Sequence, residues 1–224
     1  MLSESLIFQT VALIKQTPLT FLVMEPGGHV IAELHPIGSA FIPDEPIIVK
    51  MNKWRNRAKI FFKSQFDATI ERTKIWLSEV VVPSCDRILF MIYVDGLPVG
   101  HFGLCNINSE SAELDNAIRG EFGGGSNLFE VVERALIEIA FNELAVKEVT
   151  AKVFSNNVLA LRMHTDIGFA ELARYPLKVV QSSCMKEYIE CTSGEANVKF
   201  SYVLLSVNRS QYFNHNSLSS YLTQ

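Results

Sequence analysis

The sequence has few cysteines, and those it has are not arranged to bind a metal. Cys85, Cys105, Cys184 and Cys191 form no CxxC pair, and none of them lies with histidines at zinc-finger spacing among the 224 residues. We therefore expect no metal site. Because nothing in the sequence points to an oxidising compartment, we also expect a reducing, cytoplasmic location.

Long apolar runs and long basic runs are also absent. No stretch approaches the length of a membrane span, and the start, MLSESLIFQT, lacks the basic residues and apolar run of a signal peptide. The formal net charge is -4, and no basic run offers a footprint for nucleic acid or anionic lipid. These absences predict no nucleic-acid and no membrane partner. They still allow a small anionic ligand held by a few local donors.

Two phosphate-binding motifs are missing as well. The glycines at 120–125 are not followed by the Gly-Lys-Ser/Thr of a Walker A loop. They also fit a dinucleotide-binding fingerprint poorly, because the strand expected next ends in Phe-Ser-Asn-Asn, where that fingerprint has an acidic residue. Neither of these nucleotide-binding classes is therefore favoured.

The first half of the chain is rich in β-forming residues. The runs 20–25 and 29–34 flank a Pro-Gly-Gly turn and predict a hairpin. A second hairpin is predicted from the runs 87–94 and 98–104, because Asp95-Gly96 between them is a favoured two-residue turn.

Between the two hairpins the sequence predicts a strand and a helix. The apolar run 47–51 is interpreted as a short strand, and the spacing in 69–80 predicts a helix that ends before Pro83. The residues expected to share one face of this helix are Ile70, Ile75, Trp76 and Val80.

The second half of the chain alternates strands and helices. A strand at 111–118 runs into the glycines at 120–125, and a long helix is expected from Ser126 onward. Its apolar face is formed by Leu128, Val131, Val132, Ala135, Leu136, Ile139 and Ala140, and Glu130, Glu133, Arg134 and Glu138 are expected on the other side. A strand at 146–154 follows. A second helix is then expected, capped at 155–157, running roughly to Asp166 and ended by Gly168. Further strands are expected from Phe169 and over 199–207.

This pattern predicts one α/β domain. We place its boundaries at 41–210, with an N-terminal extension at 1–40 that contains the first hairpin, and a loosely held polar tail at 211–224.

The junction from the strand at 111–118 to the long helix is suited to phosphate. Glycines allow backbone N–H groups to approach an anion closely, and the helix dipole adds a favourable potential. No basic side chain is required, so phosphate binding is compatible with a negative net charge.

A second motif follows the strand at 146–154. Asn157, Ala160, His164, Gly168 and Phe169 fall in the order N-x-x-A-x-x-x-H-x-x-x-G-F. With the glycine-rich turn before it, this motif resembles the GNAT superfamily of acetyltransferases, in which tyrosine is commonest where His164 stands. The resemblance covers roughly residues 47–207.

The resemblance implies a fold and an activity. The fold is a mixed central sheet flanked by helices, with antiparallel early strands and a splayed central parallel pair. The activity is transfer of an acetyl group from acetyl-CoA, as cosubstrate and without a metal, to a primary amine. Edge strands in this family often pair between subunits, so the resemblance also allows a homodimer.

The glycine loop departs from the family pattern Gln/Arg-x-x-Gly-x-Gly/Ala by about one residue. Starting the pattern at Gly120 loses the leading Gln/Arg, and starting it at Arg119 puts Phe122 at the first glycine. The cofactor is still expected to contact the strand end and the loop. The residues concerned are Ala117, Ile118, Arg119, Gly123, Gly124, Gly125 and Ser126, with Asn157 either contacting the cofactor or capping its helix.

The resemblance also implies catalytic roles. His164 occupies the position of the acid that protonates the departing thiolate, and an imidazole titrates near neutrality. Glu113 and Asp115 share one face of their strand by alternation, so one of them is a candidate for the base, directly or through water.

The acceptor pocket of this family lies between the first strand and the second hairpin. Here Trp54, Arg55 and Asn56 are candidates, because an aromatic ring can stack on a sugar or base and Arg55 can pair with a phosphate. His101 is a further candidate.

These residues favour a small amino sugar, in free or nucleotide-linked form, as the acceptor. The alternatives are the N-terminus of a protein, as in ribosomal-protein acetyltransferases, an aminoglycoside or other amine, or a non-catalytic CoA-binding or interaction module. A polyamine acceptor predicts an acidic pocket, whereas a nucleotide sugar needs basic donors around Arg55.

Overall fold

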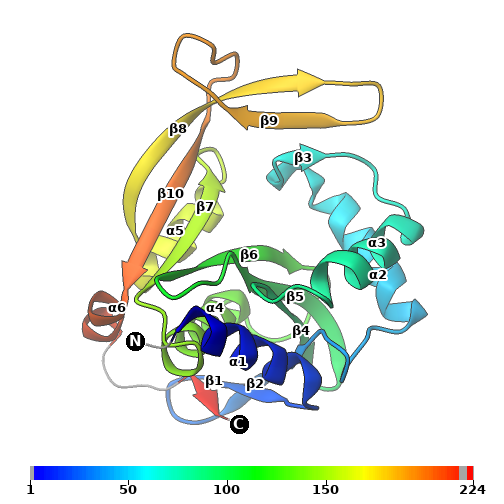
Figure 1. Cartoon of the computed structure of the whole chain (residues 1–224), viewed down its shortest axis with the longest axis vertical. Helices are drawn as coiled ribbons and strands as arrows, with labels where there is room; N and C mark the ends of the chain where they lie inside the picture. The colour runs from blue at the N-terminus through cyan, green and yellow to red at the C-terminus, as the bar shows by residue number, and fades with distance from the viewer. Residues whose placement is uncertain (1–2, 217–220, 224) are drawn as a thin grey trace.

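The computed structural model describes residues 3–216 and 221–223 (Figure 1). Over these residues, eleven strands form one sheet in the order β11 (Leu222–Thr223), β1 (Phe21–Met24), β2 (Val30–Pro36), β4 (Ile88–Val94), β5 (Leu97–Cys105), β6 (Ser111–Arg119), β7 (Glu148–Phe154), β10 (Ser201–Asn208), β8 (Ala170–Gln181), β9 (Lys186–Glu190) and β3 (Ser64–Gln65). Neighbouring strands are antiparallel except β6 and β7, which are parallel. The expected mixed sheet with one central parallel pair is confirmed.

Helices cover both faces of the sheet. They are α1 (Glu4–Gln16), α2 (Glu45–Arg57), α3 (Ile70–Trp76), α4 (Leu128–Glu138), α5 (Val158–Ile167) and α6 (Arg209–His215), with a short 3-10 helix at Lys59–Phe61 and π-helical turns after α3 and α4. In the described part of the chain, none of these helices has both the length and the apolarity needed to cross a membrane.

Strand β4 lies between two hydrophobic cores. Phe90 and Ile92 face the larger core, which contains buried residues of α1 and α4, whereas Leu89 and Met91 face a second core with α2 and the end of α3. Successive side chains of a strand point to opposite faces, so a continuous apolar run is required where both faces are covered.

The predictions for the central part of the chain are confirmed. Asp95 and Gly96 have positive φ values of 50° and 73°, as a two-residue turn between β4 and β5 requires. Helix α5 begins after Asn157, whose side chain accepts a hydrogen bond from Ala160 N at 3.3 Å. It ends at Gly168, which has a left-handed φ of 112°.

The predicted strand at 47–51 was wrong, because these residues belong to α2. The Asp44 side chain accepts a hydrogen bond from Ile47 N at 3.0 Å, and Pro46 lies in the first turn, so the helix start is well defined. Ile48, Met51 and Trp54 recur at three-residue spacing and are buried on one face. A short apolar run does not distinguish a strand from a buried helix turn.

The face predicted for α3 was partly wrong. Ile75 is 52% exposed and Val80 is 43% exposed, whereas Thr73, Leu77 and Val81 are buried. The helix widens into a π-turn over Leu77–Val81, and this change of period shifts the buried face.

The residues at 1–40 and after 208 are integrated into the domain. Helix α1 buries Ile7, Val11 and Ile14, and the β1–β2 hairpin extends the main sheet through β4. At the other end, Asn208 caps α6, and β11 pairs with β1. The expectation of an extension and a loose tail therefore does not fit the described residues, because both segments bury apolar side chains in the common core. Residues 217–220 and 224 of that tail lie outside the described residues.

Strands β8 and β9 form a long arm that reaches toward α2 (Figure 1). The strand β9 pairs with β3, in the connection between α2 and α3, and Tyr188 N donates to Lys63 O at 2.9 Å. The arm thereby ties the last third of the sheet to the connection that follows α2.

Candidate functional site

The parallel strands β6 and β7 separate after a short paired stretch. They pair only over Ser111–Leu114 and Glu148–Ala151. Beyond this point Asn116 has a φ of 56°, and the register between β5 and β6 shifts opposite it. This bulge bends β6 away from β7.

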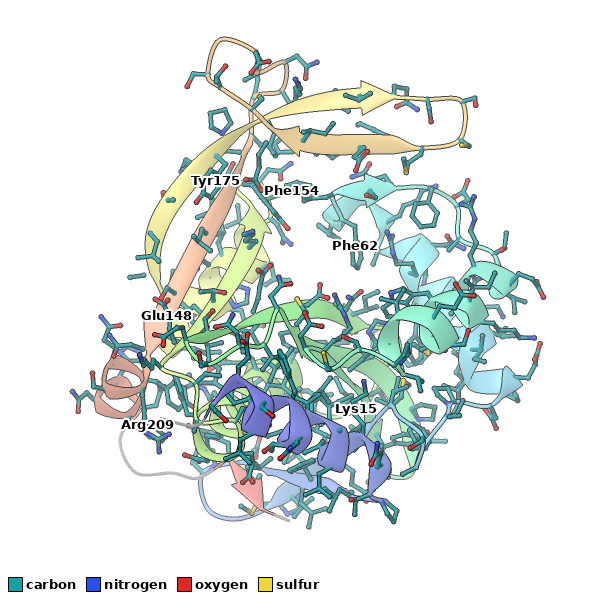
Figure 2. The ribbon with its side chains drawn as sticks, viewed as in Figure 1. Lys15, Phe62, Glu148, Phe154, Tyr175 and Arg209 are labelled. Atoms are coloured by element: carbon teal, nitrogen blue, oxygen red, sulfur yellow. The ribbon has the colours of Figure 1, made fainter. Side chains whose placement is uncertain are left out.

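The splay opens a cavity of about 410 Å³, which we call the cleft. It is lined by β6, β7, α5 and the connection after α2. Figure 2 shows Phe62, from that connection, and Phe154, at the end of β7, on opposite sides of it. The cleft presents free edges of two strands to a ligand.

The glycine loop follows directly from β6. Arg119 donates from Nη2 to Gly123 O at 2.9 Å and to Gly125 O at 3.2 Å, so two of the loop's carbonyls face the arginine. The amides of Gly123, Gly124, Gly125 and Ser126 have no acceptor in the described parts of the chain. Gly124 has a φ of 65°, a conformation that favours glycine. Free amides at the N-terminus of α4 fit a phosphate group.

Of the other residues predicted to contact a cofactor, two line the cleft and one is buried in the core. Ala117 and Asn157 line the cleft, and Asn157 also caps α5. Ile118 is 3% exposed and packs in the second core, so its side chain is turned away from the cleft. Only its backbone is suited to a ligand.

His164 lies on the wall of the cleft, and its ring is hydrogen-bonded to a buried carboxylate of α4. Its Nδ1 is 2.5 Å from Glu133 Oε1, and the Glu133 side chain is fully buried on α4. With Nδ1 bound to the carboxylate, Nε2 is the ring nitrogen that remains for a ligand. Glu133 was expected on the outer side of α4. It is buried because α5 packs against that side.

Glu133 is therefore a functional candidate that the sequence did not reveal. Its Oε2 is buried and has no hydrogen-bond partner among the described residues. No local pattern connects it with His164, which lies 31 positions away.

The two carboxylates of β6 both line the cleft, but they differ in their partners. Asp115 forms an ion pair with Arg87 and accepts from Asn116 Nδ2 at 2.6 Å. Glu113 accepts from Asn106 Nδ2 at 3.2 Å, and Lys152 Nζ lies 4.0 Å away. Arg87, the residue before β4, was not anticipated from the sequence.

A second cavity, of about 240 Å³, adjoins the cleft and is called here the side pocket. Arg55, Phe62 and Asn116 line both cavities, so these residues mark where the two meet. Of the four predicted acceptor-binding residues, Arg55 and His101 line the side pocket.

His101 is 3% exposed, and its Nδ1 lies 2.9 Å from the Asn116 carbonyl oxygen. Since a carbonyl only accepts, Nδ1 carries the proton and donates. Burial lowers the pKa of His101 to about 4, so the ring is neutral at physiological pH. A neutral imidazole bound in this way keeps Nε2 as an acceptor.

Trp54 and Asn56 have structural partners. Trp54 is 1% exposed, and its indole N–H donates to Glu121 Oε1 at 2.8 Å. Asn56 exchanges two hydrogen bonds with the backbone of Ala68, at 2.9 and 2.7 Å. Trp54 packs beneath Gly120, where an added Cβ would lie 2.1 Å from the indole ring.

The comparison with known proteins rests on structure. The sequence matches no protein-family model and no curated protein. Among solved structures, the chain is similar to the Campylobacter jejuni N-acetyltransferase PseH in complex with acetyl coenzyme A, with 16% identity over 80% of this chain and 99% of that chain and a TM-score of 0.54.

It is also similar to the spermidine N-acetyltransferase from Vibrio cholerae in complex with CoA and spermine. The identity is 15% over 87% of this chain and 97% of that chain, and the TM-score is 0.59. Both alignments span nearly the whole of the compared chains. The chain therefore has the GNAT fold, the fold of the N-acetyltransferases to which it is similar.

Proposed function

We propose that this protein transfers an acetyl group from acetyl-CoA to the primary amine of a small molecule, with an amino sugar, free or nucleotide-linked, as the acceptor class. The observation that carries the proposal is the splay of β6 and β7, which opens the cleft on the strand that leads into the glycine loop. The similarity to structures that hold acetyl coenzyme A or CoA supports the same donor here.

The loop and the strand end fit the donor. The free amides of Gly123–Ser126, with the positive end of the α4 dipole, bind the pyrophosphate. Arg119 holds the loop carbonyls away from that position. Ala117 and Asn157 line the cleft and border the rest of the donor, and Ile118 follows directly on β6.

Acetyl-CoA supplies the activated acetyl group when bound. The reaction forms a C–N bond and breaks the thioester C–S bond, so the amine loses a proton and the sulfur gains one. His164 is suited to give up the proton through Nε2, because Glu133 holds the opposite ring nitrogen. Glu133 acts as a positioning residue.

Asp115 and Glu113 are the candidates for the base. Both carboxylates line the cleft, and Asp115 forms an ion pair with Arg87. A water molecule between carboxylate and amine suffices for the transfer.

The side pocket is suited to a small acceptor. Its volume of about 240 Å³ is below the ~300–1,000 Å³ that is typical of pockets for drug-sized ligands. We assign the acceptor contacts to Arg55 and His101, and we assign Trp54 and Asn56 to the support of α2 and its following connection.

Thermal unfolding with acetyl-CoA tests this proposal. A ligand that binds only the folded state stabilises it by RT ln(1 + [L]/Kd), or about 2.7 kcal/mol at a hundredfold excess over Kd. We expect acetyl-CoA to raise the unfolding temperature by several degrees and adenosine at the same concentration to leave it unchanged. Release of free thiol in the presence of amino sugars then measures transfer.

An unchanged unfolding temperature at millimolar acetyl-CoA would contradict the proposal. A rise in temperature without thiol release from any amine would instead indicate a CoA-binding module that does not catalyse transfer.

A further inference from the structure

Arg55 carries a charge that the described parts of the chain do not neutralise. Its Nη2 donates to Ser64 O at 2.8 Å, and its guanidinium lies over the Phe62 ring, 3.8 Å from the centroid. Its Nη1 is buried and has no hydrogen-bond partner among the residues that the structure describes. No carboxylate of the described residues forms an ion pair with it.

A guanidinium that is partly buried and lacks an ion-pair partner costs free energy in the folded state. Burial penalises the charge, and for this reason the pKa of Arg55 is lowered from its ordinary value. Buried charges in proteins are normally paired, because an unpaired one loses its hydration without compensation. Holding Ser64 in place requires only one neutral donor, and the contact with the Phe62 ring supplies no counter-charge, so the positive charge is available to a ligand.

The surroundings of Arg55 in the side pocket are basic and aromatic. Arg72 also lines this pocket, with its guanidinium 5.3 Å from the centroid of Phe66. The guanidinium of Arg55 also lies 5.3 Å from the centroid of the Phe66 ring. No Asp or Glu is among the described residues that line this pocket.

This charge distribution separates acceptor classes. A polyamine is a multiple cation, and two arginines without a carboxylate would repel it. An acceptor with a carboxylate or a phosphate would supply the missing counter-charge, and the planar guanidinium can bind either group with two parallel hydrogen bonds.

We infer that the acceptor amine carries an anionic group, a carboxylate or a phosphate, which binds beside Arg55 in the side pocket while the amine points to Asn116, where the pocket meets the cleft. This inference rests on the proposed function and narrows its acceptor class. Arg55 is then a specificity-determining residue, and Arg72 contributes a second positive charge at longer range.

Matched acceptors test the inference. We would compare glucosamine, its 6-phosphate, the corresponding amino-sugar carboxylate, and spermidine, measuring kcat/KM by thiol release. For the native chain we expect at least one anionic sugar to exceed glucosamine by about 10-fold or more, because hydrogen bonds to a charged group are stronger than those between neutral groups. The comparison of the phosphate with the carboxylate identifies which anionic group is preferred.

The variant Arg55→Gln removes the charge and keeps a side-chain donor for Ser64. It should lower kcat/KM for the preferred anionic sugar by about 10- to 100-fold, mainly through KM, and lower that for glucosamine by a clearly smaller factor, so that the preference for the anionic sugar falls. Arg72→Gln changes an exposed residue and should give a smaller loss of the same kind. Arg174→Gln removes an equal charge on β8, outside both cavities, and serves as the control.

A binding measurement keeps the inference separate from the proposed function. The anionic sugar should raise the unfolding temperature of the native chain and of Arg174→Gln, but not that of Arg55→Gln. Equal kcat/KM for neutral and anionic sugars, a preference for spermidine, or no binding difference between native and Arg55→Gln would overturn the inference while acetyl transfer still stands. Failure of acetyl-CoA itself to bind would instead overturn the proposed function.

Discussion

Single residues in the cleft are oriented by partners on other elements. His164 comes from α5 and its partner Glu133 from α4, and both are buried. In the same way, the Asn116 carbonyl at the β6 bulge fixes which nitrogen of His101 carries the proton. These contacts select one ring orientation, so the orientation of each histidine depends on a second residue on another element.

At the residue scale, His164→Gln should lower kcat for acetyl transfer by about 100-fold, because a well-placed general acid contributes ~10²–10⁴-fold. The amide retains a donor for Glu133, so folding is preserved. The apparent affinity for acetyl-CoA should be little changed, and the pH–rate profile should lose the limb that belongs to the acid. Glu133→Gln should weaken the same limb with a smaller loss of kcat.

His215→Gln is the control for this pair of variants, since His215 is a histidine on α6 outside both cavities. Turnover by His164→Gln equal to that of the control would remove His164 from the mechanism.

At the scale of elements, the glycine loop leads into the start of α4 and is held by hydrogen bonds from Arg119. The Arg119 side chain binds the carbonyls of Gly123 and Gly125, and α4 begins immediately after the loop. The loop therefore presents its amides although its sequence departs from the family pattern by a residue. Spacing within such a loop can vary as long as the backbone still turns its N–H groups outward.

Gly124→Glu should abolish the stabilisation by acetyl-CoA. Gly124 has a φ of 65°, so any side chain is strained there, and a carboxylate adds repulsion of the phosphates. We expect the rise in unfolding temperature with acetyl-CoA to disappear, measured by the same thermal assay.

Gly28→Glu is the matched control, because Gly28 has a φ of 83° and nothing within 4 Å of an added Cβ. It introduces the same strain of roughly 1–2 kcal/mol and the same charge in the β1–β2 turn. If both variants respond to acetyl-CoA like the native chain, the phosphate site lies elsewhere.

At the scale of the whole molecule, the sheet is continuous from β11 to β3, and its two ends are joined to segments far apart in the chain. The C-terminal β11 pairs with β1, and the β8–β9 arm binds the connection after α2 (Figure 1). The cleft and the side pocket therefore lie within one continuous sheet and its helices, so we expect a charge buried there to affect the stability of the domain.

The stability of the domain should fall as the pH is lowered from about 6.5 to about 4. His101 has a lowered pKa of about 4 in the folded state against 6.5 for an ordinary histidine, so over this range only the unfolded chain binds the proton. The difference corresponds to about 3 kcal/mol in the free energy of unfolding.

His101→Gln should remove this contribution, and His29→Gln, which changes an exposed histidine, should retain it. Urea unfolding of the three proteins between pH 4 and 7 measures the contribution. Equal slopes for His101→Gln and the native chain would contradict it.

The features that the sequence determined by itself are local. The Asp95-Gly96 turn, the cap at Asn157, the stop at Gly168 and the spacing of the 157–169 motif each depend on a few neighbouring residues. Turns and caps are closed by hydrogen bonds over two to four positions, so their residue types identify them directly. That was sufficient to predict the central elements, and the resemblance of the 157–169 motif to the GNAT superfamily implied the fold.

The tertiary structure alone decided the rest. The short run at 47–51 became a helix, because its neighbours buried three residues on one face. The pairing of Glu133 with His164, the partner of Asp115 and the uncompensated charge of Arg55 depend on elements far apart in the chain. Such contacts arise only when packed elements meet, and no periodicity or spacing within one segment records which side chains will face each other.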